Sequence, residues 1–342
     1  MTTMRRVVAH PGRIAIETAD VPAPGPDEVL IRTLLAGVCG SDLHAAHGRH
    51  PFVPLPYRPG HEVVGVIETL GSGAGTWESG QRVTVEPDLP CWTCKMCTSG
   101  RENLCENLQF FGCGYGQGGM ADYFTIAAHR LHAVPAGLDD HAAALIEPLS
   151  TPVHAVHLAG DVAGRAVAVL GSGTIGLLTL AVLRAHGAGR VVTTDPLPDK
   201  RARAAALGAD STIDASTPDV ARQVRTALGG SADVVFDCVA IQSSVEQAIA
   251  MADKGGTVVV VGVPAREVSI PLPIMQDHQI RLQGSATYLP EDFEESAGLL
   301  SRRVVKARDF VTATRPLPQV AEAFELAASG EHVKVLVTIG ER

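Results

Sequence analysis

Residues 166–195 read AVAVLGSGTIGLLTLAVLRAHGAGRVVTTD, and this stretch decides the fold of the chain. Its first five residues form a short apolar strand, and residues Leu177 to Ala185 have helical composition. Arg190 to Thr194 then returns to a strand that ends at Asp195. The turn after the first strand matches G-x-G-x-x-G through Gly171, Gly173, Thr174, Ile175 and Gly176. In this strand-turn-helix-strand context, the pattern predicts a dinucleotide site whose pyrophosphate meets amide groups at the helix N-terminus.

Asp195 stands nineteen residues after the last glycine of the turn. An acid at this place accepts hydrogen bonds from a ribose 2′-hydroxyl and repels a 2′-phosphate, so the sequence predicts NAD rather than NADP. Lys200 and Arg201 complicate this prediction because they lie close to the acid. They are candidate cofactor residues, or else solvated residues that open the next helix.

Further strand-like runs follow at DVVFD, residues 233–237, and TVVVVG, residues 257–262. The helical stretch SSVEQAIAMADKG separates them, and Val261 in the second run is another candidate cofactor residue. Alternating strands and helices of this kind build a parallel, doubly wound sheet, which places the chain in the α/β class.

The size and charge of the chain limit its organisation and its partners. At 342 residues it exceeds the length at which one core usually stops growing, so two domains are expected. A formal charge of −9 and the absence of a Lys/Arg cluster argue against a nucleic-acid or anionic-membrane surface. Pro11 and Gly12 interrupt the N-terminus, which lacks the apolar run of a signal peptide. We therefore expect a cytoplasmic protein.

Four of the seven cysteines lie in one short stretch, at Cys91, Cys94, Cys97 and Cys105. In a reducing compartment such a cluster is more typical of a metal site than of disulfides. The four thiolates form the ligand set of a closed, tetrahedral structural zinc site. Free or redox-active cysteines and an iron-sulfur cluster are the alternatives.

A second constellation lies upstream, in GVCGSDLHAAHG and RPGHEVVGVI. It offers the potential ligands Cys39, His44, His47, His61 and Glu62, with a hydroxyl at Ser41. A thiolate, an imidazole and a carboxylate make a three-ligand zinc set that leaves a fourth position open for water or substrate. Glu147, followed by Pro148 in an apolar segment, is a further candidate ligand, since carboxylates in such surroundings need a partner or a cation. Its alternative role is that of an acid in the first turn of a helix.

These motifs together resemble the zinc-dependent medium-chain dehydrogenases, in particular the polyol (sorbitol), butanediol and threonine dehydrogenase branch. The resemblance covers essentially the whole chain. It rests on VCGSDLH, on GHE with Gly65, on GQRV, on the cysteine cluster, on IEPLS, on the glycine turn and on the closing strand EHVKVLV. Each motif alone is weak, whereas the combination is specific.

The resemblance implies a GroES-like, β-rich catalytic domain and an inserted Rossmann domain. The implied boundaries are 1–152 with 287–342, carrying a zinc lobe at 90–106, and 153–286. Cys39 and His61 would hold the catalytic zinc, and Glu62 or Glu147 would complete its shell. Ser41 and His44 resemble the proton relay of the family, and Ser285 follows the return to the catalytic domain, near the nicotinamide end of NAD.

The implied activity is the oxidation of a secondary alcohol or polyol to a ketone, with hydride transfer to NAD and two zinc ions per chain. The substrate stays open among sorbitol-like polyols, vicinal diols, cyclitols and threonine-like alcohols. The alternatives are a catalytically silent nucleotide-binding protein of the same fold and an NADP-preferring alcohol dehydrogenase or carbonyl reductase. Besides the small alcohol we expect a homodimer or homotetramer, with contacts near 257–262 and the following segment, and neither nucleic acid nor membrane.

Overall fold

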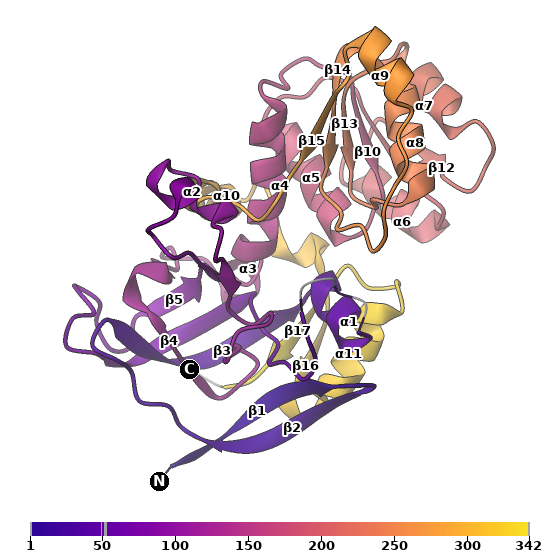
Figure 1. Cartoon of the computed structure of the whole chain (residues 1–342). Coiled ribbons are helices and arrows are strands. Elements are labelled where there is room, and N and C mark those ends of the chain that lie inside the picture. Colours follow the sequence, from indigo (N-terminus) through magenta and orange to yellow (C-terminus); the bar gives the residue numbers. More distant parts are fainter. Residues whose placement is uncertain (1, 49, 51–52, 341–342) are drawn as a thin grey trace. The chain divides into compact units, whose positions relative to one another are not determined.

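The computed structural model describes residues 2–48, 50 and 53–340 (Figure 1). The chain forms two compact units, residues 1–148 with 289–342 and residues 149–288. No helix in the described ranges is long and apolar enough to span a membrane.

The unit of residues 149–288 is built on a six-stranded sheet in which every strand is parallel to its neighbours. Its strands are β10 (Val167–Leu170), β11 (Val191–Asp195), β12 (Ser211–Asp214), β13 (Ala232–Asp237), β14 (Ala252–Val260) and β15 (Arg281–Gly284). Their spatial order is β12-β11-β10-β13-β14-β15, so the order reverses beside β10. This confirms the doubly wound parallel sheet predicted from the sequence.

Helices connect these strands and cover both faces of the sheet (Figure 1). They are α4 (Ile146–Ala159), α5 (Thr174–Ala185), α6 (Pro198–Ala206), α7 (Val220–Leu228), α8 (Gln242–Met251) and α9 (Leu272–His278). The central strand β10 is Val-rich and fully buried because both faces are covered. In α7 the buried residues Val220, Val224 and Leu228 recur every four positions, which gives the helix one apolar face toward the sheet.

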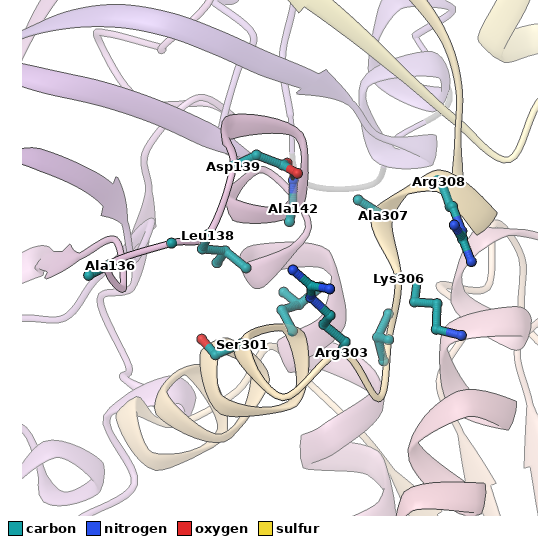
Figure 2. A pocket seen from close by; sticks show the side chains of 12 residues that line it. Ala136, Leu138, Asp139, Ala142, Ser301, Arg303, Lys306, Ala307 and Arg308 are labelled. Carbon is teal, nitrogen blue, oxygen red and sulfur yellow. Dashed lines mark hydrogen bonds between the residues drawn. The ribbon is translucent and has the colours of Figure 1, made fainter.

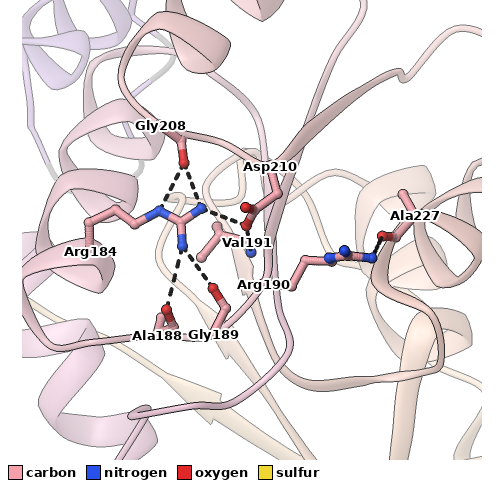
Figure 3. A network of polar contacts seen from close by, with 8 residues as sticks. All are labelled: Arg184, Ala188, Gly189, Arg190, Val191, Gly208, Asp210 and Ala227. Atoms are coloured by element: carbon pink, nitrogen blue, oxygen red, sulfur yellow. Dashed lines mark hydrogen bonds and ion pairs between the residues drawn. The ribbon is translucent and has the colours of Figure 1, made fainter.

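Arg184, at the end of α5, ties together the loops that lead into β11 and β12 (Figure 3). Its guanidinium donates to the carbonyl of Gly208 at 2.8 Å through Nε and to that of Gly189 at 2.8 Å through Nη1. Nη2 lies 2.6 Å from Oδ2 of Asp210, an atom that also accepts from the Val191 amide at 2.7 Å. One planar, forked side chain therefore satisfies several loop acceptors at once.

We expect Arg184→Ala to lower the free energy of unfolding by about 2 kcal/mol, because it removes several charged hydrogen bonds together. Arg190→Ala is the matched control, since among the described residues the Arg190 side chain donates only to the Ala227 carbonyl, at 3.0 Å (Figure 3). Urea unfolding of the native protein and of both variants measures how much free energy of unfolding each variant loses. Equal losses in the two variants would contradict the special role of Arg184.

The other unit contains a sheet of seven mainly antiparallel strands. They are β3 (Glu28–Val38), β4 (Val63–Leu70), β5 (Arg82–Val85), β8 (Tyr123–Ala127), β9 (Leu131–Ala133), β16 (Val311–Pro316) and β17 (Lys334–Thr338). β3 is the organising strand, because it pairs with β4 along most of its length, with β8 at its start and with β17 at its end. Its long apolar run, EVLIRTLLAGV, suits a strand buried on both faces.

Shorter elements complete this unit. They are the hairpin β1 (Thr3–His10) and β2 (Arg13–Asp20), the pair β6 (Asp88–Leu89) and β7 (Gln109–Phe110), and the helices α1 (Gly40–Ala46), α2 (Lys95–Thr98), α3 (Asp140–Ala143), α10 (Pro290–Ser301) and α11 (Val320–Ala328). Single 3₁₀ turns lie at Glu102–Leu104, Ala128–Arg130, Ala307–Asp309 and Leu317–Gln319. Helix α11 packs on β16 and β17 through Val320, Ala323 and Phe324.

Candidate active site

The register of β3 and β4 brings Cys39, His61 and Glu62 together. Cys39 directly follows β3, and Glu62 directly precedes β4. Because the strands are antiparallel, with Ala36 opposite Val63, the end of β3 lies beside the start of β4. One ligand atom from each of the three residues lies within 4.8 Å of the others. The structure thus assembles the three-ligand set predicted from the sequence.

The imidazole of His61 is buried, and Asp42 lies behind it. Nδ1 of His61 lies 4.0 Å from Oδ1 of Asp42, whose carboxylate accepts from the Cys39 amide at 3.0 Å and the Tyr57 hydroxyl at 3.1 Å. Burial alone lowers the pKa of His61, but the charge of Asp42 and the Cys39 side chain raise it well above its ordinary value. The surroundings are therefore arranged for a positive charge.

Lys334 is a site residue that sequence reasoning did not find. It opens β17, which pairs with β3 so that Val335 lies opposite Val38. Its Nζ lies 2.6 Å from Oε1 of Glu62 and donates to the carbonyl of Val38 at 3.3 Å, and the side chains of Lys334 and Glu62 are both buried. Burial by itself lowers the pKa of Lys334, but Glu62, Cys39 and Glu147 raise it above its ordinary value. The only sequence signal was a lysine inside the apolar closing strand.

The residues present fit a metal ion. Within the described residues, Nδ1 of His61 and Oε2 of Glu62 are buried and have no hydrogen-bond partner. Buried polar atoms normally have partners, and a carboxylate with one oxygen on Lys334 keeps the other available for a cation. Gly37 makes room for this carboxylate, since a Cβ there would lie 1.8 Å from Oε2.

The remaining residues predicted for the zinc site are the further candidate ligand Glu147 and the proton-relay candidates Ser41 and His44. Glu147 is buried in the first turn of α4, and its charge raises the pKa of His61 and Lys334, but it is not one of the three mutually close ligands. Ser41 and His44 both lie on α1, Ser41 partly buried and His44 exposed. Cys113 lies nearby, where burial raises the pKa of its thiol to about 12.

The glycine-rich segment 112–119 supports the loop that carries His61. Gly60 has φ +108, and a Cβ there would lie 2.3 Å from the amide nitrogen of Met120. A Cβ on Gly112 would lie 2.2 Å from the carbonyl oxygen of Gly60. Backbone bonds join the two segments, from the Gly119 amide to the Gly60 carbonyl at 2.8 Å and from the Met120 amide to the Pro59 carbonyl at 3.1 Å. Only glycines permit this close approach of two backbones.

The four cysteines of the lobe also converge. Their sulfur atoms lie within 4.8 Å of one another, with Cys94 3.5 Å from Cys97 and 3.9 Å from Cys105. A tetrahedral zinc ion with Zn–S bonds of about 2.3 Å requires sulfur separations of about 3.8 Å. The cluster has the size of a closed zinc site.

Hydrogen bonds in the lobe favour thiolates. Those from Thr93 lower the pKa of Cys91 to about 5, and backbone amides of Cys97 and Glu106 lower the pKa of Cys94. Loss of solvent and the neighbouring Cys94 raise the pKa of Cys97 to about 12. Without a cation between the sulfur atoms, Cys97 therefore keeps its proton near neutral pH.

We expect Cys94→Ser to lower the zinc content by one ion per chain and the stability of its unit by about 3 kcal/mol. The folded fraction should keep its activity, since a closed site holds structure and does not react. Metal analysis and thermal unfolding, with the exposed neighbour variant Lys95→Ala as control, test this. Unchanged zinc content and melting temperature would contradict the structural role.

The glycine turn has the geometry of a phosphate-binding loop. Gly171 has φ +87, Gly173 is the N-cap of α5, and a Cβ on Gly176 would lie 1.9 Å from the Gly171 carbonyl oxygen. The helix begins at Thr174, before the predicted Leu177, because the N-cap at Gly173 includes Thr174 and Ile175 in the first turn. The first amide groups of any α-helix have no partner within the helix, and helix N-termini of this kind favour anions.

Three of the remaining candidate cofactor residues lie at the carboxyl ends of the parallel strands. Asp195 ends β11, and its carboxylate accepts from the Ser172 and Leu197 amides at 2.9 Å each. Val261 follows β14 and Ser285 follows β15, and the Ser285 hydroxyl is buried with no partner in the described ranges. Lys200 and Arg201 lie on α6. This edge, at the reversal of strand order, is where open α/β sheets bind ligands.

Comparison with known proteins places this geometry in a family. The chain matches the model of the alcohol dehydrogenase GroES-like domain over residues 25–136 and that of the zinc-binding dehydrogenase over residues 174–302. It is 34% identical over 328 residues to L-galactonate-5-dehydrogenase of Escherichia coli, covering 95% of each chain. It is also 34% identical to sorbitol dehydrogenase of Gallus gallus, covering 97% of this chain and 95% of that protein.

The chain belongs to the zinc-binding medium-chain alcohol dehydrogenase family. This confirms the family and the GroES-like plus Rossmann fold predicted from the sequence. Among solved structures, a putative zinc-binding dehydrogenase from Sinorhizobium meliloti bound to NADP superposes with a TM-score of 0.92 at 32% identity, over 99% of this chain and all of that one. The protein is thus a zinc-binding dehydrogenase that is similar over nearly its whole length to L-galactonate-5-dehydrogenase and sorbitol dehydrogenase.

Proposed function

We propose that this dehydrogenase oxidises a secondary alcohol of a polyol or sugar acid to the ketone, with NAD as the hydride acceptor. The convergence of Cys39, His61 and Glu62 carries the proposal. One Glu62 oxygen is neutralised by Lys334, and the other has no partner in the part of the chain that the structure describes. When bound, zinc supplies a Lewis acid that lowers the pKa of the alcohol, and the nicotinamide ring accepts the hydride.

The residues of the chain have separable tasks in this reaction. Cys39 and His61 would hold the cation, and the buried carboxylate of Asp42 lies 4.0 Å from Nδ1 of His61. The remaining ligand is Glu62, with Glu147 as the alternative that the sequence left open. The ammonium group of Lys334 neutralises part of the negative charge of Glu62 beside Cys39. The ligands therefore add less negative charge to the cation, which stays a stronger electrophile.

Ser41 and His44 would carry the proton released by the alcohol. Ser41 lies two residues after Cys39 and is partly buried, whereas His44 is exposed to water. A hydroxyl inside the site and an imidazole at the surface form the two ends of a short path to solvent. Both lie on helix α1, whose N-cap residue is Cys39.

A panel of alcohols tests the proposed reaction. Sorbitol, L-galactonate, 2,3-butanediol, a cyclitol and threonine are each incubated with zinc-loaded protein and NAD, and absorbance of the reduced cofactor is followed. We expect turnover of at least one polyol or sugar acid. No turnover across the panel, despite bound zinc and NAD, would instead favour the catalytically silent alternative.

Two observations favour NAD over NADP: the charge of Asp195, and the contacts of the Arg201 guanidinium with other groups of the chain. Arg201 donates to the carbonyls of Asp195 and Pro196 at 2.8 Å each and pairs with Asp214 at 3.2 Å. Its guanidinium is therefore already committed, while the Asp195 charge would repel a 2′-phosphate. The relative that binds NADP keeps an NADP-preferring enzyme as the second candidate.

We expect Asp195→Asn to shift the ratio of kcat/KM for NAD over NADP by on the order of 100-fold toward NADP, which is about 2.7 kcal/mol. Asparagine keeps an acceptor for the Ser172 or Leu197 amide and removes the charge. Asp199→Asn, at an exposed site on α6, is the control. A native enzyme that already prefers NADP would contradict the proposed cofactor.

We also propose a cytoplasmic homo-oligomer whose contact includes the edge of the parallel sheet. β14 lies between β13 and β15, so the edge strand on this side of the sheet is β15 and not the run 257–262. Apolar side chains are exposed on β15 and before it, at Val263, Ile270, Leu272, Ile274 and Leu282. Light scattering after size exclusion measures the number of chains in the assembly, and a monomer would refute the proposed oligomer.

We further propose that the catalytic domain comprises residues 1–152 with 287–342 and that the nucleotide-binding domain comprises residues 153–286.

A further inference from the structure

A cavity of about 560 Å³ lies in the unit of residues 1–148 and 289–342, and it shares no residue with the sites above (Figure 2). Its lining is Ala136, Gly137, Leu138, Asp139, Ala142, Leu300, Ser301, Arg303, Val305, Lys306, Ala307 and Arg308. Of these, Leu138, Ala142, Leu300 and Val305 are buried and form an apolar floor. A second hollow of about 430 Å³ adjoins it through Asp139, Ala307 and Arg308. The cavity is large enough for a small metabolite.

The lining carries three cations in a protein of net charge −9. The expectation that the chain has no Lys/Arg cluster is wrong for this segment, since Arg302, Arg303, Lys306 and Arg308 fall within SRRVVKAR, residues 301–308. Arg303 and Lys306 have no ion-pair partner among the described residues, and Arg308 lies 3.8 Å from Asp309. The one carboxylate of the lining, Asp139, already accepts from the Ala142 amide at 2.8 Å. The cavity is therefore positively charged.

The backbone conformation of Arg303 is a second observation, separate from the charge of the cavity, that points to a role for this side chain. The amides of Arg303 and Val304 donate to the carbonyls of Leu300 and Leu299, each at 3.0 Å, which is a Schellman motif ending α10. Arg303 occupies its left-handed position with φ 59, where glycine is the usual residue. In Figure 2 its guanidinium points into the space between Leu138 and the segment that carries Lys306 and Ala307. A costly conformation at an unpaired arginine indicates a role for that side chain beyond the fold.

We propose that this cavity binds a phosphate group, as free phosphate or as the monoester of a small metabolite. A guanidinium offers two parallel donors to a phosphate. Lys306 and Arg308 add positive charge from the neighbouring segment of the lining, although their side chains extend away from Arg303 in Figure 2. The apolar floor suits the carbon skeleton of an ester. The chain thus has a second small-molecule site, which does not depend on the proposed activity.

Titration calorimetry of the zinc-loaded full chain tests the site with inorganic phosphate, glucose 6-phosphate and glucose at constant ionic strength. We expect glucose 6-phosphate to bind and glucose not to bind. Arg303→Asn, which tolerates the left-handed conformation, and Lys306→Glu, on the exposed segment, should each weaken binding at least ~10-fold. Arg302→Ala, beside the cavity but outside its lining, should leave the affinity unchanged.

The variants also separate this cavity from the glycine turn, which can bind phosphate too. Binding that Arg303→Asn and Lys306→Glu leave unchanged, or no binding beyond that of chloride, would overturn the proposal. Equal affinity for inorganic phosphate and glucose 6-phosphate would support the site and identify the phosphate group alone as its ligand.

Discussion

His61→Ala is expected to lower turnover by on the order of 10³-fold, because loss of a Lewis acid removes about 4 kcal/mol of charge stabilisation. Cys39→Ser should have a similar effect, since the two residues provide the imidazole and the thiolate of one ligand set. Binding of NAD should persist in both variants, because the glycine turn and Asp195 belong to the other unit of the chain.

Three measurements separate this effect from misfolding. Metal analysis should show one zinc ion fewer per chain, titration with reduced cofactor should show unchanged affinity, and thermal unfolding should show a folded protein. His47→Ala is the matched control, because His47 is exposed and its Nδ1 lies 2.7 Å from the carbonyl oxygen of Leu43. A fully active His61→Ala enzyme would refute the assignment of the metal site.

Lys334→Met is expected to destabilise the metal-free protein by about 3–5 kcal/mol, because it leaves the buried carboxylate of Glu62 without its partner. Methionine fills a similar volume, so the loss reports the charge rather than a cavity. A bound divalent cation would offset part of the uncompensated charge. The loss should therefore be smaller in zinc-loaded protein than in metal-free protein.

A double-mutant cycle makes the Lys334 prediction specific. Glu62→Gln removes the carboxylate charge, so Lys334→Met should cost much less in that background. Lys254→Met, at an exposed position, controls for the loss of a lysine as such. Urea unfolding gives the stabilities of the four proteins of the cycle, each with and without zinc. Equal costs of Lys334→Met in both backgrounds would show that the pair is not coupled.

The local parts of the fold and of the candidate site could be predicted from the sequence. Within the few residues 171–176, glycines allow a tight turn, let α5 pack closely on the preceding strand and leave an anion site at the N-terminus of α5. This pattern can be recognised without any residue that is distant in the sequence. The cysteine lobe is similar, because four ligands within fifteen residues converge through short spacers. Cys39 and His61 were candidates from their residue types, and the resemblance to the family then assigned both to one zinc ion.

The sequence by itself determined which residue types carry the chemistry and the strand-turn-helix unit that surrounds the nucleotide turn. Only the tertiary structure decided that Lys334, 272 positions away, pairs with Glu62, that 112–119 packs against Gly60, and that Arg303 enters a cavity. The physical reason is the distance along the sequence over which each kind of interaction acts. Helix periodicity and turn chemistry act between near neighbours, whereas the pairing of β17 with β3 depends on strand register, which many weak contacts across the whole sheet select together.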